Sequence, residues 1–275
     1  MDPNAPIGVF DSGMGGLTVL EALRRALPGE RFLYLGDTAR LPYGTKSRET
    51  VQRYAVQAAR ILVERGVKAL VIACNTASAV ALDALASRYA PLPVYGVVEP
   101  GARAAAAVAN GGRVLVLATE STVSGGAYQR ALLGLRPRLQ VLARPCPLLV
   151  TLAEEGRHDG PLVRLALTEY LRGALPAAGR RPVDTLLLGC THFPVFRPAL
   201  AALLAEAGRP DAVVVDSAET MAAALAAELA AGRVPAASTA AGELTLLATD
   251  GRERFRRVGA YFLGHPVDEV ELVDL

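Results

Sequence analysis

Two matching stretches of this sequence carry residues that could do acid–base chemistry. Residues 69–76 (ALVIACNT) and 185–192 (TLLLGCTH) each run an apolar segment into a cysteine, Cys74 or Cys190, that hydrogen-bonding side chains follow. A thiolate can take a proton and a thiol can return one. Two thiols that face each other across a pocket could therefore remove a proton from one side of a carbon atom and add one to the other, which inverts its configuration. Cys146 lies between two prolines without such a polar cluster, and we interpret it as structural.

The same residues allow two other chemistries. Cys190 and His192 could act as nucleophile and base in acyl transfer, as in amidases. These two residues stand at one strand end, however, and the repeated cysteine at Cys74 would have no use. Cys74, Cys190 and His192 could also be zinc ligands, yet neither C-x-x-C nor H-x-x-x-H spacing occurs. Paired thiols fit the repetition best, and we expect no metal.

The apolar runs before the cysteines predict the elements that would hold them. A continuous apolar run bounded by turn residues is typical of a strand that helices cover on both faces, as in a parallel sheet. Each cysteine would then lie at the carboxyl edge, where open α/β sheets bind ligands. Other predicted strands also end in polar residues: 7–10 in Asp11 and Ser12, 31–37 in Asp37, and 113–118 in the hydroxyls of residues 119–124.

A glycine-rich segment follows the first predicted strand. Residues 11–16 read DSGMGG, and an amphipathic helix is predicted from residue 17 to residue 27. Glycines at such a place allow a tight turn and can present free helix-start N–H groups to an anion. The spacing is not the dinucleotide fingerprint, because Thr18 stands where its last glycine should be.

Length and charge limit the classes of function. The 275 residues fit two domains of ordinary size. The formal net charge of +2 is close to zero and the charges are interspersed, so we expect no nucleic-acid or acidic-membrane partner. One local basic cluster, at Arg252, Arg254, Arg256 and Arg257, is best explained as a solvated helix face.

The sequence also indicates a cellular compartment. The first residues have no basic region and lead directly into a strand, and no apolar run reaches membrane-spanning length without charge or turn residues. We therefore expect a cytoplasmic protein, not associated with a membrane. In that reducing environment the cysteines would be free thiols.

Seven segments, in order along nearly the whole chain, resemble the glutamate racemases of bacterial cell-wall synthesis. They are residues 7–17 (IGVFDSGMGGL), 34–47 (YLGDTARLPYGTKS), 73–78 (ACNTAS), 96–101 (GVVEPG), 117–124 (LATESTVS), 146–156 (CPLLVTLAEEG) and 188–194 (LGCTHFP). The resemblance implies racemisation of L- and D-glutamate, supplying D-glutamate for peptidoglycan, without pyridoxal phosphate, metal or nucleotide.

The resemblance also implies an architecture. We expect two doubly wound α/β domains related by pseudo-twofold symmetry, with the active site in the cleft between them. One domain would comprise residues 1–97 plus 211–275, and the other residues 98–210. A homodimer is expected as well.

Functional residues carry over from the family position by position. Cys74 would deprotonate D-glutamate and Cys190 the L form. The supporting catalytic residues would be Asp11, Asp37, His192 and Glu154, although Glu155 adjoins the last of these and leaves the choice open. The substrate-binding positions would be Asp11, Ser12, Pro42, Tyr43, Gly44, Cys74, Asn75, Thr76, Thr119, Thr122, Cys190, Thr191 and His192.

Two alternative functions stay open. The first is a related racemase that acts on aspartate. The second is a non-catalytic binding protein on the same scaffold that acts on a partner enzyme. The intact pair of Cys74 and Cys190 argues against the loss of catalysis.

Overall fold

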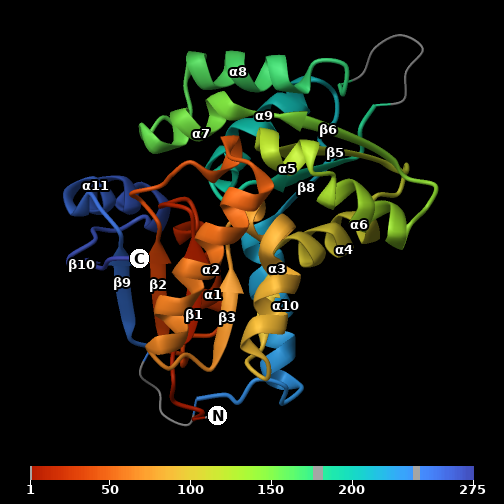
Figure 1. Cartoon of the computed structure of the whole chain (residues 1–275). Coiled ribbons are helices and arrows are strands. Elements are labelled where there is room, and N and C mark those ends of the chain that lie inside the picture. Colours follow the sequence, from red (N-terminus) through yellow and green to blue (C-terminus); the bar gives the residue numbers. More distant parts are fainter. Residues whose placement is uncertain (1, 176–181, 238–241) are drawn as a thin grey trace.

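The computed structural model describes residues 2–175, 182–237 and 242–275, and the strands among them form two separate parallel sheets (Figure 1). The first sheet has six strands in the order β10-β9-β2-β1-β3-β4. They are Ile7–Asp11 (β1), Phe32–Gly36 (β2), Ala69–Ile72 (β3), Val94–Gly96 (β4), Leu244–Ala248 (β9) and Glu271–Leu272 (β10). The second sheet has four strands in the order β6-β5-β7-β8. They are Arg113–Ala118 (β5), Gln140–Pro145 (β6), Thr185–Gly189 (β7) and Val213–Asp216 (β8).

The two sheets share one topology. In the first, β2 pairs with β1, β1 with β3 and β3 with β4, all in parallel. In the second, β6 pairs with β5, β5 with β7 and β7 with β8, again in parallel. Each sheet thus contains the strand order second-first-third-fourth, and the third strand of each leads into a cysteine. This repeat agrees with the expected pseudo-symmetry and explains why Cys74 and Cys190 have matching sequence contexts.

The central strands are buried on both faces, as their apolar runs predict. In β3, Val71 belongs to one hydrophobic core and the next residue, Ile72, to another. Successive side chains of a strand point to opposite faces of a sheet. The two cores therefore lie on opposite helix-covered faces of the first sheet, and the core of Val71 continues into the second sheet at Leu186 and Leu188.

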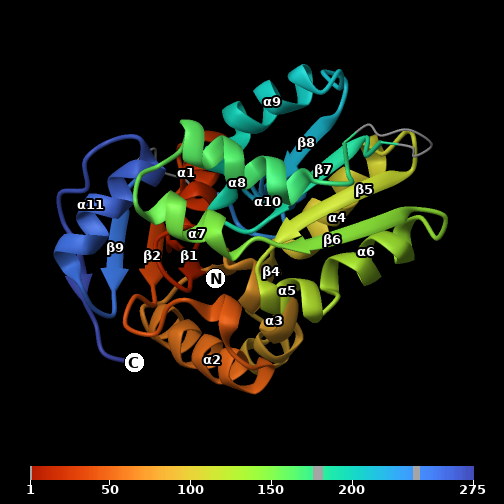
Figure 2. The same ribbon diagram turned by 90° about the horizontal axis from the view of Figure 1, so that it is seen from above.

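Helices surround both sheets, and we name each sheet with its helices as a unit. The first unit contains α1 (Leu17–Ala26), α2 (Arg48–Glu64), α3 (Asn75–Tyr89), α11 (Arg252–Leu263) and the short 3₁₀ helix η1 (Tyr43–Thr45). The second unit contains α4 (Val98–Val108), α5 (Glu120–Ser124), α6 (Ala127–Leu135), α7 (Pro147–Glu154), α8 (Pro161–Leu171), η2 (Phe193–Phe196) and α9 (Arg197–Glu206). The remaining helix, α10 (Ser217–Ala230), packs against both α1 and α4 and so joins the units (Figures 1 and 2). None of the helices in the described ranges is long and apolar enough to cross a bilayer.

One boundary differs from the sequence expectation. We assigned residues 211–275 to the first domain, but β8 pairs with β7 from Thr185↔Val213 to Leu188↔Asp216 and lies in the second sheet. An apolar strand placed there covers an edge of β7 that would otherwise leave its backbone groups unpaired. The chain therefore returns to the first unit through α10, not before β8.

Candidate active site

Both candidate thiols open into one pocket. Cys74 follows β3 at the start of α3, and Cys190 directly follows β7. Each cysteine is only 4% exposed. They line a shared pocket of about 220 Å³. Because its walls follow the carboxyl ends of strands in both sheets, the pocket lies where α/β sheets bind ligands.

Most of the predicted site residues line this pocket. Those that do are Ser12, Pro42, Tyr43, Gly44, Cys74, Asn75, Thr76, Thr119, Cys190, Thr191 and His192. The other predicted site residues lie outside the lining, and their hydrogen bonds place them behind it: Asp11, Asp37, Thr122 and Glu154. Sequence reasoning missed the remaining lining residues, which are Thr45, Glu120, Pro147, Val150 and Thr151. The last three stand in a segment that we singled out only for its glutamate, so no local signal marked them.

Cys74 lies in a buried, weakly polar environment. Its Sγ is 3.5 Å from Ser12 Oγ, and the Ala77 N–H donates to the same sulfur at 3.5 Å. Burial, with a further contribution from the Asp11 carboxylate, raises the pKa of the Cys74 thiol to about 12. At neutral pH this thiol therefore holds its proton in the unliganded protein.

Asp11 is fully buried at the end of β1 behind Cys74. Its Oδ2 accepts a hydrogen bond of 2.9 Å from the Gly13 N–H, while its Oδ1 has no partner among the described residues. Burial raises the pKa of the Asp11 carboxyl, although His192 and nearby backbone N–H groups oppose that shift. An unpartnered buried acceptor of this kind is costly to keep and points to a functional constraint.

Cys190 begins a chain of contacts that runs through His192 to Glu154. Its Sγ lies 3.7 Å from His192 Nδ1, and His192 Nε2 lies 3.1 Å from Glu154 Oε1. Burial disfavours the imidazolium, but the hydrogen bonds with Cys190 and Glu154 outweigh it and raise the pKa of His192 to about 10. Glu154 is also desolvated, yet His192 and Arg254 hold the pKa of its carboxyl below the usual value. A protonated His192 therefore stands between the sulfur and the carboxylate.

The structure distinguishes the two adjacent glutamates. Glu154 is the last residue of α7 and contacts His192, whereas Glu155 is exposed. Neighbouring helical positions point about 100° apart, so only one of them can face the imidazole.

Asp37 organises the loop that forms one wall of the pocket. Its Oδ2 accepts hydrogen bonds from the Tyr43 hydroxyl and, at 2.7 Å, from Arg40 Nε. Its Oδ1 accepts a bond of 3.0 Å from the Thr249 hydroxyl. Burial and the neighbouring Asp37 raise the pKa of Tyr43 above its ordinary value. Asp37 thus fixes Tyr43 and Gly44 in the pocket wall without lining the pocket itself.

Three threonine hydroxyls join the two units beside the pocket. Thr76 lies in α3, whereas Thr119 caps α5 and Thr122 lies within it. Their hydroxyl oxygens are 2.9 to 3.2 Å apart in all three pairs. Thr122 therefore orients the two hydroxyls that line the pocket.

Asn75 is oriented by two residues that the sequence did not indicate. Its Nδ2 donates to Ser217 Oγ at 3.1 Å, and its Oδ1 accepts from the Tyr128 hydroxyl at 3.2 Å. Ser217 starts α10 and Tyr128 lies in α6. Only the packing of these helices brings them to Asn75.

The glycines after β1 allow close contacts around the site. A Cβ on Gly15 would lie 2.5 Å from both Nδ1 and Cε1 of His192, and one on Gly16 would lie 2.4 Å from Asp11 Cβ. Real Cβ atoms do not approach other atoms this closely. The backbone before α1 thus packs closely against His192 and Asp11. Only glycine, which has no Cβ, fits at positions 15 and 16 without a clash.

We also searched the described residues for the zinc site that the sequence left as an alternative. No group of three or more histidine, cysteine, aspartate or glutamate side chains there could hold a metal ion. Cys74, Cys146 and Cys190 are all free thiols.

Two parallel sheets whose carboxyl ends share one pocket, with a cysteine at the equivalent strand end of each, define a two-sheet α/β enzyme. Residues 7–225 match the family model described as Asp/Glu/Hydantoin racemase. The chain belongs to this family.

The relatives of this chain are similar over their full length. It is 46% identical over 273 residues to the glutamate racemase of Geobacter metallireducens, a match that covers 99% of this chain and 98% of that protein. Glutamate racemase from Thermus thermophilus, solved in complex with beta-chloro-D-alanine, is 44% identical with a TM-score of 0.88 and coverage of 100% and 99%. The enzyme of Francisella tularensis, solved in complex with D-glutamate, is 37% identical with a TM-score of 0.88 and coverage of 99% and 98%. These similarities confirm the expected fold class and the resemblance to glutamate racemases.

Proposed function

We propose that this protein interconverts L- and D-glutamate and that Cys74 and Cys190 are its two acid–base groups. The observation that carries the proposal is that both thiols line one pocket from equivalent positions in two sheets. The full-length similarity to glutamate racemases supports glutamate as the substrate.

Inversion at the α-carbon requires one deprotonated and one protonated sulfur. From L-glutamate, the Cys190 thiolate takes the α-proton and the Cys74 thiol donates its own proton to the other face, which yields D-glutamate. The reverse reaction exchanges the two roles. The high pKa of Cys74, about 12, suits the donor role in the first direction. Holding both sulfurs against one carbon replaces encounters in solution by fixed geometry.

The substrate carboxylates would be held by neutral donors. Ser12, Asn75, Thr76, Thr119 and Thr191 place hydroxyl and amide groups in the pocket lining. Pro42, Tyr43 and Gly44 also line the pocket. In a site that excludes water, such donors bind an anion more strongly than they would in solution.

The supporting residues act through the two sulfurs and through the side chains that line the pocket. Asp11 and His192 lie beside the two sulfurs and would tune their proton affinity. Glu154 orients His192, Asp37 fixes Tyr43, and Thr122 orients Thr76 and Thr119.

We extend the proposal to the cellular role, the assembly and the domains of the protein. D-glutamate formed here would serve peptidoglycan synthesis in the cytoplasm, and the protein would act as a homodimer. We further propose that the two units are its two domains, with α10 as the link between them.

The test is racemisation of L-glutamate in deuterated water, followed by chiral analysis and mass spectrometry. We expect D-glutamate that carries one solvent deuterium at the α-carbon, and no comparable turnover of L-aspartate. Faster turnover of L-aspartate would instead identify an aspartate racemase.

Cysteine variants test the two-thiol mechanism in the same assay. Cys74→Ala and Cys190→Ala should each abolish racemisation while the circular dichroism spectrum stays unchanged. Cys146→Ala is the matched control, since Cys146 is a buried thiol outside the pocket lining, and it should retain activity. Near-normal racemisation by either pocket variant would refute the mechanism.

A further inference from the structure

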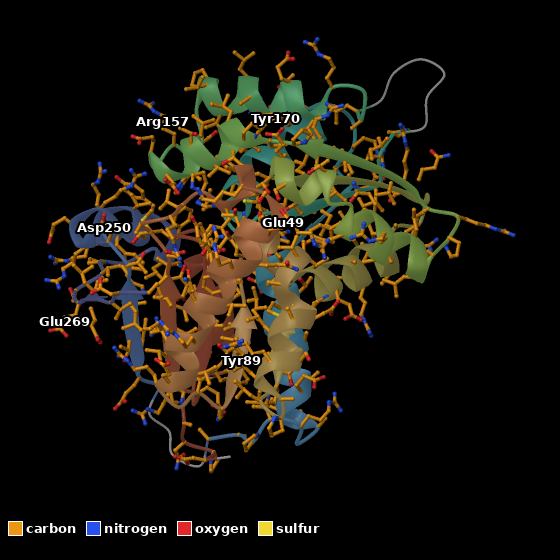
Figure 3. The ribbon with its side chains drawn as sticks, viewed as in Figure 1. Glu49, Tyr89, Arg157, Tyr170, Asp250 and Glu269 are labelled. Carbon is orange, nitrogen blue, oxygen red and sulfur yellow. The ribbon has the colours of Figure 1, made fainter. Side chains whose placement is uncertain are left out.

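One arginine reaches the acid–base chain from the other unit. Arg254 lies in α11 of the first unit, and Glu154 ends α7 of the second unit. Arg254 Nη2 donates to Glu154 Oε2 at 2.7 Å. Arg157, just after α7, and Asp250, just before α11, lie on the same side of the molecule (Figure 3).

We propose that Arg254 is a positioning residue for the Cys190 half of the reaction. Its ion pair with Glu154 makes the alignment of Cys190 and His192 depend on how α11 meets α7. The inference rests on the proposed function and adds a residue to it.

The geometry of one carboxylate carries the argument. Glu154 uses Oε1 for His192 and Oε2 for Arg254, so both oxygens are occupied by charge-assisted hydrogen bonds. The Glu154 side chain is 11% exposed, and solvent has little access to it. Without Arg254 the carboxylate keeps a single partner and is free to rotate, and the imidazole loses its fixed orientation toward Cys190 Sγ.

A second contact from the same helix reaches the imidazole directly. Phe262 of α11 packs edge-on against the His192 ring, with centroids 5.4 Å apart at 87°. Helix α11 therefore contacts the His192 ring through Phe262, and it acts on His192 Nε2 indirectly, through the bond from Arg254 to Glu154. Because α11 belongs to the first unit, a movement of the units relative to each other would shift both contacts together.

The arginines around Arg254 show that its role is particular to its position. We expected all four arginines of this cluster to form a solvated face. Arg257, which is exposed, does meet that expectation, because it makes no ion pair with any residue that the structure describes. Arg254 does not belong to a purely solvated face. Half of its side chain is exposed, but its guanidinium bonds to Glu154.

The proposal predicts that loss of Arg254 slows proton transfer at Cys190 but not at Cys74. A comparison of kcat/KM in the two directions cannot reveal this difference. L- and D-glutamate have equal free energies in water, so kcat/KM must be equal in the two directions for every variant. A higher barrier for proton transfer at Cys190 appears instead in the primary deuterium isotope effects. The effect on kcat/KM should rise for α-deuterated L-glutamate, whose bond breaks at Cys190. It should fall for α-deuterated D-glutamate, whose bond breaks at Cys74.

The experiment compares Arg254→Gln with the matched control Arg257→Gln on the same helix. We expect Arg254→Gln to lower kcat about tenfold, the size of one partly exposed charged hydrogen bond, with the isotope effects displaced in opposite senses. Arg254→Lys should restore part of kcat. Arg257→Gln should match the wild type in all of these quantities.

Isotope effects are ratios, so partial unfolding of a variant does not alter them. Unchanged isotope effects in Arg254→Gln, or a change of the same sense for both enantiomers, would overturn the inference. That outcome leaves the proposed function standing, provided that Cys74→Ala and Cys190→Ala are inactive. Near-normal racemisation by those cysteine variants would instead remove the two-thiol mechanism on which this inference rests.

Discussion

Glu154 Oε1 lies 3.1 Å from His192 Nε2, and this contact determines which nitrogen of the imidazole faces the cysteine. The other ring nitrogen, Nδ1, is left 3.7 Å from Cys190 Sγ. The carboxylate thus both orients the ring and stabilises its charge, in the way that outer partners of a functional histidine commonly do.

Removing the charge of Glu154 should damage catalysis. In Glu154→Gln the neutral amide supports the imidazolium less well, so we expect kcat to fall roughly tenfold to a hundredfold. Steady-state racemisation measured by circular dichroism of the product gives kcat directly. Glu155→Gln is the matched control, because Glu155 is exposed and does not contact His192, and its kcat should stay within twofold of the wild-type value. Equal losses in the two variants would contradict the assignment of Glu154.

The His192–Glu154 pair should make stability depend on pH in a defined window. His192 has a pKa raised from 6.5 to about 10, so its contribution is complete below pH 6.5 and is lost as the pH rises toward 10. The pKa of Glu154 is lowered from 4.5, so its contribution is present above that pH and is lost as the pH falls through the folded-state value. The pair is therefore at full strength between pH 4.5 and 6.5.

Urea denaturation checks this window. At pH 6 the free energy of unfolding of Glu154→Gln should be about 1.5–3 kcal/mol below that of the wild type, the range for a hydrogen bond to a charged group. The difference should shrink as the pH approaches 10. A difference that stays constant between pH 6 and pH 10 would show that the pair does not titrate as described.

Gly15→Ala should displace His192. The added Cβ would lie 2.5 Å from His192 Nδ1 and Cε1, so the ring has to leave its present position beside Cys190. We expect kcat to fall at least about tenfold and the free energy of unfolding to fall by about 1–3 kcal/mol, as for other overpacked sites. The control is Gly29→Ala, where a Cβ meets nothing within 4 Å, and there both quantities should stay near the wild-type values. Full activity of Gly15→Ala would mean that the imidazole position is unimportant.

Tyr43→Phe should affect stability and substrate binding more than kcat. The variant removes the hydroxyl that donates to Asp37, while Arg40 and Thr249 still bond to this carboxylate. We expect a loss of about 1–3 kcal/mol in unfolding free energy and a KM several times higher, with a smaller change in kcat. Tyr54→Phe is the control, because its ring packs 5.7 Å from that of Tyr43 but its hydroxyl bonds to no described residue. A KM unchanged in Tyr43→Phe would argue against a role for this bond in holding substrate.

The sequence by itself determined the strand ends and the residues placed there. Short apolar runs bounded by turn residues predict strands that helices cover on both faces, and the polar residues after them fall at the carboxyl edge. This reasoning located Cys74 and Cys190, and the family resemblance supplied the two-sheet fold and the remaining site positions. Each of these signals is local in the chain.

Tertiary structure alone decided which further residues, beyond those expected from the sequence, support the pocket from distant helices. Arg254, Tyr128, Ser217 and Phe262 reach the site from helices whose packing no local pattern encodes. The same holds for β8, whose apolar sequence suits either sheet and whose partner, β7, is chosen by edge pairing. A strand end is set by a few consecutive residues, whereas a contact between distant helices depends on the position and rotation of both, which the whole fold fixes.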